Sequence, residues 1–345
     1  MLKATYKKHN LIFKKQAGTS RGVLLEKPSW YLILEQNGKR GVGECSVLPK
    51  LSLEKNTDLS PVFEEICVEI HLGEEYLKQK WKHFPAVHFA IEMAFLDLYF
   101  GKEKEFFANN FFERKEGIVT NGLIWMSDKA DMLKQIEDKI QQGFKCVKLK
   151  IGAINWQDEL DLLRHIRQSY SSNKIELRVD ANGAFSPESA LEKLEALAKF
   201  DIHSIEQPIG AGQGKAMANL CKHTPLPIAL DEELIGIQKT EEREILLSTI
   251  NPQYIILKPS LVGGFADAEE WVSLAEKNKV GWWATSALEG NIGLNAIAQW
   301  TSKMKVNMPQ GLGTGALFTN NIESPLTIKG EKLIYTSVDW QNISI

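Results

Sequence analysis

The chain has 345 residues, enough for one barrel of about 250 residues and a smaller attached domain. With 43% hydrophobic residues, 25% charged residues and a net charge of −3, nothing suggests nucleic acid or an anionic membrane as a partner. The first residues lack the apolar core of a signal peptide, no apolar run is long enough to span a membrane, and the scattered cysteines indicate reduced thiols. These features predict a cytoplasmic enzyme.

Residues 1–115 are predicted to form an α+β domain. Alternating side chains at 30–35 lead into Asn37-Gly38, a strong hairpin signal between two strands. A later stretch is apolar nearly all round, so we expect a helix that is buried between two layers. The expected elements are a strand meander over 2–48, a helix near 61–72 and the buried helix over 85–100.

From residue 116 to residue 319, strand-like and helix-like patterns alternate in the rhythm of a βα barrel. Ser127, Asn155 and Ser186 are predicted to cap the first three helices of this part. The tail over 320–345 is expected to return to the first domain. The expected strands are 118–125, 146–150, 175–180, 203–208, 227–232, 254–259, 281–286 and, as an eighth, 306–313.

Several successive strand-like runs end in charged residues, which recur roughly every 25 to 30 positions, about the length of one βα unit. The C-terminal ends of neighbouring barrel strands lie side by side around one rim, where this fold keeps its chemistry. The charged side chains are therefore expected to converge. The runs are CVKLK with Lys148 and Lys150, LRVD with Asp180, SIE with Glu206, IALD with Asp231 and YIILK with Lys258.

Three of these residues are carboxylates on consecutive strands: Asp180, Glu206 and Asp231. Carboxylates that are brought together repel one another unless a cation lies between them. Hard oxygen ligands with room for water favour Mg²⁺. Any one of the three could instead cap the helix that follows its strand, because Asp is common there. All three together predict a metal site.

The lysines are predicted to supply acid–base chemistry. Lys148 and Lys150 are two apart on one strand and share a face, which we expect to point into the barrel. Mutual repulsion and a nearby dication would lower their pKa values, so that one can act as a base near neutral pH. Lys258 enters from the other side of the metal. Arg178 shares the face of Asp180 and either orients the site or only packs in the barrel.

A divalent metal between opposed lysines suits proton abstraction next to a carboxylate. The metal holds the carboxylate and the resulting enediolate, while a lysine removes the proton from the adjacent carbon. A barrel that only binds a ligand, without catalysing a reaction, would not need both the three acids and the lysines. A Schiff-base lyase would use a lysine without three convergent acids.

The motifs that carry these residues resemble those of the enolase superfamily, in its muconate-lactonising subgroup. They fall in order along nearly the whole chain and read KLKIG, RVDANGAF, IEQP, ALDEE, ILKPSLVGG and SALEGNIGLNAIAQW. The resemblance implies an α/β fold, a modified (β/α)7β barrel of the TIM type with an N-terminal α+β capping domain. The domains would be 1–115 together with the tail 320–345, and 116–319.

Within the subgroup the chain looks most like the o-succinylbenzoate synthases. These enzymes dehydrate 2-succinyl-6-hydroxy-2,4-cyclohexadiene-1-carboxylate to 2-succinylbenzoate in menaquinone biosynthesis. The resemblance implies a small-molecule dicarboxylate substrate and Mg²⁺, for which Mn²⁺ can substitute. It implies that Lys150 removes the proton and then protonates the leaving hydroxyl, that Lys258 stabilises the intermediate from the opposite side, and that Lys148 tunes Lys150.

The other implied roles concern binding. Mg²⁺ would be held by Asp180, Glu206 and Asp231. Ser286 would help to hold a substrate carboxylate, and 19–22 would form either a loop that closes over the site or an ordinary turn. Further residues expected near the substrate are Arg178, Asn182, Thr19 and Arg21.

Two related activities stay open. N-acylamino acid racemases and dipeptide epimerases share the metal and lysine set, and in them both lysines act as bases on opposite faces. Many dipeptide epimerases have an Asp-x-Asp after the eighth strand, whereas this chain reads QGLGTGALFTNN there, with no acid. The sequence leaves the choice between monomer and homo-oligomer open.

Overall fold

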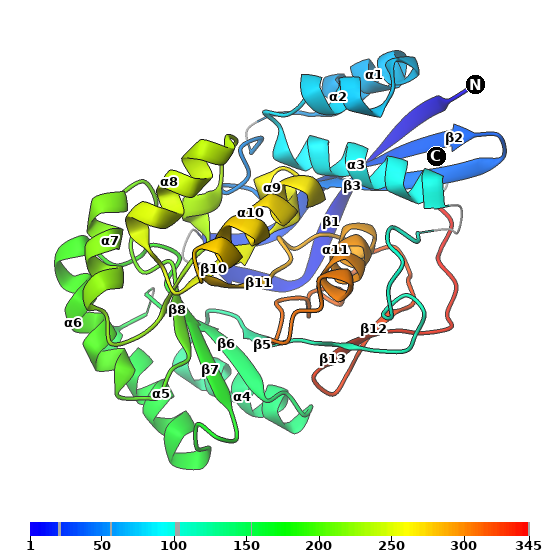
Figure 1. Cartoon of the computed structure of the whole chain (residues 1–345). Coiled ribbons are helices and arrows are strands. Elements are labelled where there is room, and N and C mark those ends of the chain that lie inside the picture. Colours follow the sequence, from blue (N-terminus) through cyan, green and yellow to red (C-terminus); the bar gives the residue numbers. More distant parts are fainter. Residues whose placement is uncertain (20–21, 56, 101–103, 153, 344–345) are drawn as a thin grey trace.

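We describe the chain from a computed structural model, which covers residues 1–19, 22–55, 57–100, 104–152, 154–343. An antiparallel sheet and three helices form an upper part, and a ring of parallel strands wrapped by helices lies below it (Figure 1). The predicted α/β class with a barrel and a separate N-terminal sheet is confirmed.

The N-terminal sheet has the order β1-β2-β3, with β1 (Lys3–Thr19), β2 (Gly22–Gln36) and β3 (Lys39–Ser46). Asn37 and Gly38 both have positive φ, 52° and 77°, as a two-residue hairpin of this type requires. The predicted hairpin is therefore confirmed. Its two strands pair from Gln36 and Lys39 back to Ser29 and Ser46.

Helices α1 (Ser60–Glu69), α2 (Glu74–Lys80) and α3 (Pro85–Phe100) cover this sheet, and a short 3-10 turn, η1 (Ile70–Leu72), follows α1. Along α3, apolar side chains are buried on nearly every side. One side packs against β3, and on another the Phe89 ring meets Phe265 of the barrel at 5.0 Å between centroids. The prediction of a helix buried between two layers is confirmed. The sequence interpretation placed a helix near 61–72 and did not identify α2.

Seven parallel strands form the barrel sheet, in the order β11-β10-β9-β8-β7-β6-β5. Each strand lies beside its neighbour in sequence, as in a singly wound barrel. The strands are β5 (Gly122–Ile124), β6 (Cys146–Lys150), β7 (Glu176–Asp180), β8 (Ser204–Glu206), β9 (Ile228–Leu230), β10 (Tyr254–Leu257) and β11 (Gly281–Ala284).

The helices form the outer ring of the barrel. Their bounds are α4 (Lys129–Gln141), α5 (Trp156–Ser169), α6 (Pro187–Ala198), α7 (Gly214–His223), α8 (Thr240–Ile250), the short α9 (Pro259–Val262), α10 (Phe265–Lys277) and α11 (Asn291–Met304), with the 3-10 turn η2 (Glu232–Leu234) after β9. The sequence interpretation did not identify α7, which begins in the glycine-rich run GAGQGK.

Asn155 and Ser186 cap α5 and α6, because their side chains accept hydrogen bonds from the first-turn amides at Gln157 and Ser189. The prediction for α4 is wrong by one residue. Asp128, and not Ser127, is its N-cap, since the Asp128 side chain accepts from the amide of Asp131. Asp and Ser are equally good caps, so their adjacency left the register undecided.

The predicted eighth strand is also wrong as a regular element. Residues 306–313, all of them described, make only isolated bridges, from Gln310 to Thr120 and from Gly311 to Thr285. The Gln310 amide donates to Val119 at 2.8 Å, and the Gly311 amide donates to Ala284 at 2.8 Å. This short extended segment closes the ring between its first and last strands without forming a full ladder.

The predicted first barrel strand over 118–125 divides in two. Its first half, β4 (Ile118–Val119), pairs with β13 (Lys332–Tyr335) and not with the barrel. The antiparallel partner of β13 is β12 (Leu326–Lys329). The tail also reaches the N-terminal sheet, because the Arg40 guanidinium donates to the Ile343 carbonyl at 2.5 Å. The division into 1–115 with 320–345, and 116–319, stays a prediction.

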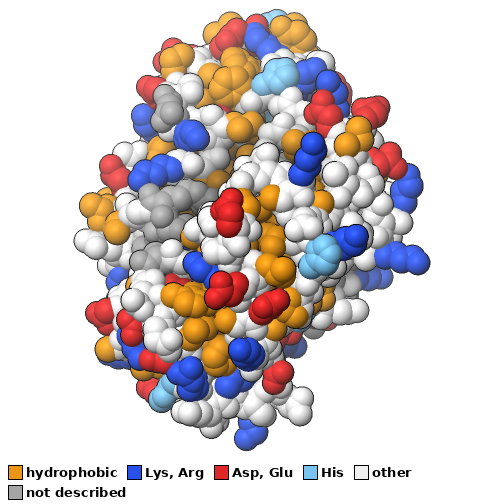
Figure 2. Space-filling view, turned by 90° about the vertical axis from the view of Figure 1, so that its left-hand side faces the viewer, with side chains coloured by type: hydrophobic (Ala, Val, Ile, Leu, Met, Phe, Trp, Pro, Cys, Tyr) orange, Lys and Arg blue, Asp and Glu red, His pale blue; other side chains and the backbone are white. Residues whose placement is uncertain are grey.

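Acidic and basic side chains are interspersed on the face of the molecule that Figure 2 displays, and apolar side chains gather in several groups between them, mainly in the middle and lower part of the view. Among the described residues, no helix combines the length and the apolar character that crossing a membrane requires.

Candidate active site

The strand register brings the predicted residues together. Lys150 pairs with Asp180 across β6 and β7, and Asp180 pairs with Glu206 across β7 and β8. These three side chains therefore stand at one level at the C-terminal rim of the barrel. Asp231 immediately follows β9 and belongs to the same rim. The predicted convergence of strand ends is what the register produces.

Ammonium groups lie between the acids. Lys148 Nζ is 3.0 Å from Asp180 Oδ2 and forms a second, shorter ion pair with Glu206. Lys258 Nζ pairs with Asp231 and is 3.8 Å from Glu206 Oε1. Carboxylates and ammonium groups thus alternate across the site, and Glu206 lies at its centre. Burial is nearly complete for the three acids, whose exposed fractions are only 1–2%.

Lys150 is held at the edge of this array. Its Nζ donates to Asp180 Oδ2 at 3.1 Å and to Asn182 Oδ1 at 2.7 Å. The Asn182 amide group in turn donates to Glu232 Oε1 at 3.1 Å. The φ of Asn182 is 45°, a left-handed conformation that asparagine tolerates better than most residues. These contacts fix the direction of the Lys150 amine.

Burial and charge act in opposite directions on these groups. Burial, together with the Asp180 and Asp231 carboxylates, raises the pKa of Glu206 to about 8. Burial also opposes ionisation of Asp180, yet Lys148, Lys150 and Lys258 outweigh it and hold the Asp180 pKa well below its usual range.

Burial lowers the pKa of Lys148 and of Lys258, but the surrounding carboxylates outweigh it and leave both pKa values above normal. Each of these ammonium groups faces carboxylates first, and repulsion between lysines is the weaker effect. The lowered pKa values that the sequence predicts for Lys148 and Lys150 depend on a nearby dication and stay a prediction; among the protein's own groups, the pKa of Lys148 is raised.

The acids fit a divalent cation by their chemistry. All three offer carboxylate oxygens on neighbouring strand ends, and Glu206 Oε1 is buried without a hydrogen-bond donor among the described residues. Burial and then repulsion from the other two acids raise the Glu206 pKa, and a bound cation would offset both effects. Among the described residues, no three His, Cys, Asp or Glu side chains are grouped closely enough to hold a metal ion, and the ammonium groups of Lys148 and Lys258 pair with Glu206 and Asp231.

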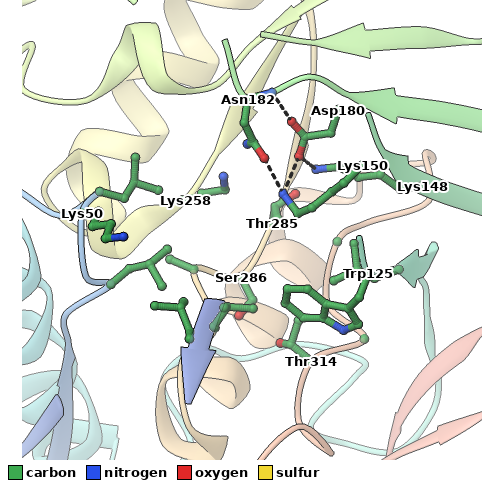
Figure 3. Close-up of a pocket in the computed structure, with 18 of the residues that line it drawn as sticks. Lys50, Trp125, Lys148, Lys150, Asp180, Asn182, Lys258, Thr285, Ser286 and Thr314 are labelled. Atoms are coloured by element: carbon green, nitrogen blue, oxygen red, sulfur yellow. Dashed lines mark hydrogen bonds and ion pairs between the residues drawn. The ribbon is translucent and has the colours of Figure 1, made fainter. Parts of the chain in front are cut away.

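One cavity lies over this array, and Figure 3 shows it. Lys148, Lys150 and Asp180 lie on one side of it, and Lys258 points in from the other side. Apolar residues of the N-terminal part also line the cavity. Those residues are Leu24, Leu48, Pro49 and Leu51.

Ser286, predicted to hold a substrate carboxylate, also lines the cavity. Its hydroxyl donates to Glu289 Oε2 at 2.6 Å, and the other oxygen of Glu289 accepts from Ser260 at 2.5 Å. The loop after β11 is also tied to the N-terminal sheet, because Lys27 Nζ donates to the Leu288 carbonyl at 2.7 Å.

Arg178 lies below the cavity and does not line it. Its guanidinium donates to Glu176 Oε1 at 2.7 Å and to the Pro309 carbonyl at 2.9 Å, and it stacks 4.5 Å from the centre of the Trp283 ring. These contacts favour the packing interpretation of this arginine.

The predicted loop over 19–22 is only partly described. Thr19 ends β1, and Gly22 begins β2 and lines the cavity. Arg21 and the side chain of Thr19 lie outside the described residues, so the loop's predicted closure stays a prediction.

Sequence reasoning missed Glu232, Glu289 and Lys50. Glu232 follows Asp231 directly, so the same strand-end argument could have found it. Glu289 and Lys50 reach the site through loops whose position depends on tertiary packing, and no local pattern marks them.

The sequence profile of the family described as Enolase C-terminal domain-like matches residues 131–330. This chain belongs to the enolase superfamily. Its alignment with the o-succinylbenzoate synthase of Desulfotalea psychrophila is 46% identical and covers 95% of this chain and 98% of that protein. The crystal structure of MenC from Desulfotalea psychrophila LSv54 matches with a TM-score of 0.86 and 42% identity, over 96% of this chain and 99% of that one.

A more distant similarity is to the N-succinylamino acid racemase of Thermus thermophilus, at 27% identity over 80% of this chain and 75% of the relative. The predicted superfamily and the predicted likeness to o-succinylbenzoate synthases are confirmed. The enolase superfamily barrel and its cap account for the two parts of the fold seen here.

Proposed function

We propose that this chain is an o-succinylbenzoate synthase, which dehydrates 2-succinyl-6-hydroxy-2,4-cyclohexadiene-1-carboxylate to 2-succinylbenzoate. The observation that carries the proposal is the 46% identity to such an enzyme over nearly the full length of both chains. The site geometry supports it, because two lysines reach one cavity from opposite sides beside three acids. The place of this reaction in menaquinone biosynthesis belongs to the proposal.

Asp180, Glu206 and Asp231 would hold Mg²⁺, or Mn²⁺ in its place. When bound, the dication supplies positive charge that stabilises the negative charge developing on the substrate carboxylate. Without such stabilisation, the hydrogen on the neighbouring carbon is too weakly acidic for an amine to remove.

Lys150 is the proposed base. Its unprotonated amine takes the proton from C1 of the ring, next to the carboxylate. The electron pair of that C–H bond forms the C1–C6 double bond, and the C6–O bond breaks. The ammonium on Lys150 returns the proton to the departing hydroxyl, which leaves as water. Asp180 and Asn182, which bind Lys150 Nζ, direct this amine.

Lys258 and Lys148 have supporting roles in this proposal. Lys258, on the opposite side of the cavity, acts as a cation that stabilises the negative charge developing on the substrate after C1 loses its proton. Lys148 lies two residues before Lys150 on β6 and forms ion pairs with Asp180 and Glu206. Its ammonium group therefore contributes positive charge near the proposed base. Ser286 donates to Glu289, and its hydroxyl oxygen remains able to accept or share a hydrogen bond at the cavity wall.

Racemisation of N-acylamino acids is a second candidate, because amines on opposite sides of a carbon can act as two bases. The similarity to the Thermus thermophilus racemase favours considering it. Dipeptide epimerisation has less support, since the segment over 310–321 carries no acid to bind a substrate amino group. We therefore propose dehydration as the main activity and test racemisation beside it.

The test is an ultraviolet assay for the aromatic product. Lys150→Ala and Lys258→Ala should each reduce kcat by at least about a thousandfold while the protein remains folded. Lys145→Ala is the matched control, because Lys145 precedes β6 and its side chain is 77% exposed. Full activity in either site variant would contradict the two-lysine mechanism. A parallel deuterium-exchange assay with N-succinyl amino acids measures racemisation.

The proposed partner is a small dicarboxylate, and we propose no nucleic-acid or membrane partner. The cytoplasmic location stays a prediction, and so does the choice between monomer and homo-oligomer.

A further inference from the structure

We propose that Lys50, from the capping part of the chain, binds the second carboxylate of the substrate, at the end of its succinyl side chain. The inference rests on the proposed function, which requires a substrate with two carboxylates. One of these groups lies at the acid and lysine array on the barrel rim. The other is carried away from the ring by the side chain and needs a partner of its own.

The charges in the cavity single out Lys50. Four lysines line it, and no arginine or histidine does so among the described residues. Lys148, Lys150 and Lys258 each contact the acids at the barrel rim. Lys50 is the cation outside that array. In Figure 3 it lies on the side of Lys258, farther from Asp180 than Lys258 is.

The residues around Lys50 favour a charged partner for the second carboxylate, and Lys50 itself is exposed at the margin of the cavity. Leu24, Leu48 and Leu51 also line the cavity, and Leu48 and Leu51 belong to the turn that carries Lys50. An ionised carboxylate that leaves water for an apolar wall loses hydration, and only a charged or hydrogen-bonding group replaces it. Apart from the lysines and Asp180, the Asn, Ser and Thr residues of the lining are neutral, namely Asn121, Asn182, Thr285, Ser286 and Thr314. A lysine at this wall supplies the matching charge.

The backbone holds Lys50 in place. The Leu51 and Ser52 amides donate to the Leu48 carbonyl at 3.1 and 3.0 Å, and the Leu48 amide donates to Ser52 Oγ at 2.8 Å. Within this turn the φ of Lys50 is 68°, in the left-handed region. Glycine or asparagine occupies such a position without the strain that a lysine experiences. Strained positions of this kind gather at binding sites, and here the strained residue presents a cation to the cavity.

A glycine opposite makes room for the ammonium group. Gly22, at the start of β2, has a φ of 117°, and a Cβ added to it would lie 3.1 Å from Lys50 Nζ. The Lys50 ammonium therefore rests against the Gly22 backbone, where the first hairpin meets the loop after β3. Two segments of the capping part meet at this cation, at the margin of the cavity.

The experiment measures steady-state kinetics and product binding for Lys50→Met, which keeps an unbranched apolar stem without the charge. KM should rise about tenfold, the change expected for loss of one charge-assisted hydrogen bond. The inhibition constant of 2-succinylbenzoate should rise by the same factor, while kcat changes by less than about threefold. The inhibition constant of 2-butanoylbenzoate, which lacks the second carboxylate, should stay unchanged. Lys50→Arg should restore most of the affinity.

Two further variants separate binding from structure. Lys55→Met changes an exposed lysine that follows the same turn and does not line the cavity, and it should behave as wild type. Lys50→Gly relieves the left-handed strain, so its melting temperature should equal or exceed that of wild type although its KM rises as in Lys50→Met.

Unchanged KM and inhibition constants in Lys50→Met would overturn the assignment. An equal loss of affinity for 2-succinylbenzoate and 2-butanoylbenzoate would overturn it as well, because that result means a general disturbance of the cap. Failure of the proposed function is a separate result, since wild-type protein would then form no aromatic product.

Discussion

Single residues in this protein show how burial sets the behaviour of an acid. Glu54, in the loop before α1, is 2% exposed. One of its oxygens accepts from the Ala86 amide at 2.8 Å, and the other has no donor among the described residues. Burial is the main cause that raises the pKa of Glu54 to about 7. An isolated buried carboxylate thus binds a proton more readily than it would in water.

The Glu54 pKa predicts a pH dependence of stability. Between about pH 4.5 and pH 7, the folded protein keeps a proton on Glu54 that the unfolded chain has released. The contribution is therefore fully present below pH 4.5 and is lost as the pH rises through 7. Glu54→Gln, which mimics the protonated form, should flatten this part of the profile. At pH 8 it should be more stable than wild type by up to about 3 kcal/mol.

Denaturant unfolding at pH 5 and pH 8 checks this prediction, with Glu65→Gln as the control at an exposed glutamate whose side chain is 47% accessible. If wild type and Glu54→Gln lose the same stability between the two pH values, the folded protein does not hold a proton on Glu54 in this pH range.

The lysines and acids of the site could be predicted from the sequence because one periodic pattern fixes them. A residue at the end of a barrel strand points to the rim whatever the rest of the fold does, so Asp180, Glu206 and Lys258 followed from spacing. Lys50 and Glu289 could not be predicted in that way. Their positions depend on how a cap loop and the loop after β11 pack together.

At the level of elements, the tightest contact joins β3 to α3. Gly41 and Gly43 face this helix, and a Cβ on either would overlap backbone atoms of the helix. The strand therefore lies directly on the helix backbone. The next residue on the strand, Glu44, accepts from the amides of Gly290 and Gly293 at 2.6 and 2.9 Å, and so connects the cap to the start of α11.

Gly43→Ala should destabilise the protein by at least about 3 kcal/mol, because the added methyl group meets the Ala90 carbonyl, which cannot rotate away. Thermal unfolding measures the effect. Gly214→Ala is the matched control at the first turn of α7, where nothing lies within 4 Å of the added methyl group and the substitution favours the helix. Equal melting temperatures for Gly43→Ala and wild type would contradict the close packing of β3 on α3.

Elements with regular patterns could be predicted, and the exceptions depend on tertiary contacts. The hairpin at Asn37-Gly38 and the buried α3 were correct because turn chemistry and composition decide them. The prediction of a regular strand over 306–313 was wrong, because long-range contacts on both sides hold this segment extended without a ladder of hydrogen bonds. The helix α7 was missed because glycines precede it and begin it. Its apolar face stabilises the helix only by packing against the barrel.

At the scale of the whole molecule, the catalytic cavity exists because the cap covers the open end of the barrel. The floor comes from barrel strand ends, and the wall around Leu24, Leu48 and Leu51 comes from the N-terminal part. The barrel contributes the acids and three of the lysines, and the N-terminal part contributes apolar residues and Lys50 beside them.

The charge balance of the complete site predicts how the protein responds to metal removal. Excess chelator should abolish turnover, and Mg²⁺ or Mn²⁺ should restore it, since the three acids would hold the ion. The fold should survive, because Lys148 and Lys258 can neutralise the same acids through the ion pairs seen here. Loss of the bound ion should therefore lower stability by only about 3 kcal/mol for an ion present at a hundred times its Kd.

Activity assays and thermal unfolding, each with and without chelator, measure the two effects in one preparation. Unchanged rates in chelator would count against a metal at these acids, and global unfolding would show that the lysines cannot replace its charge.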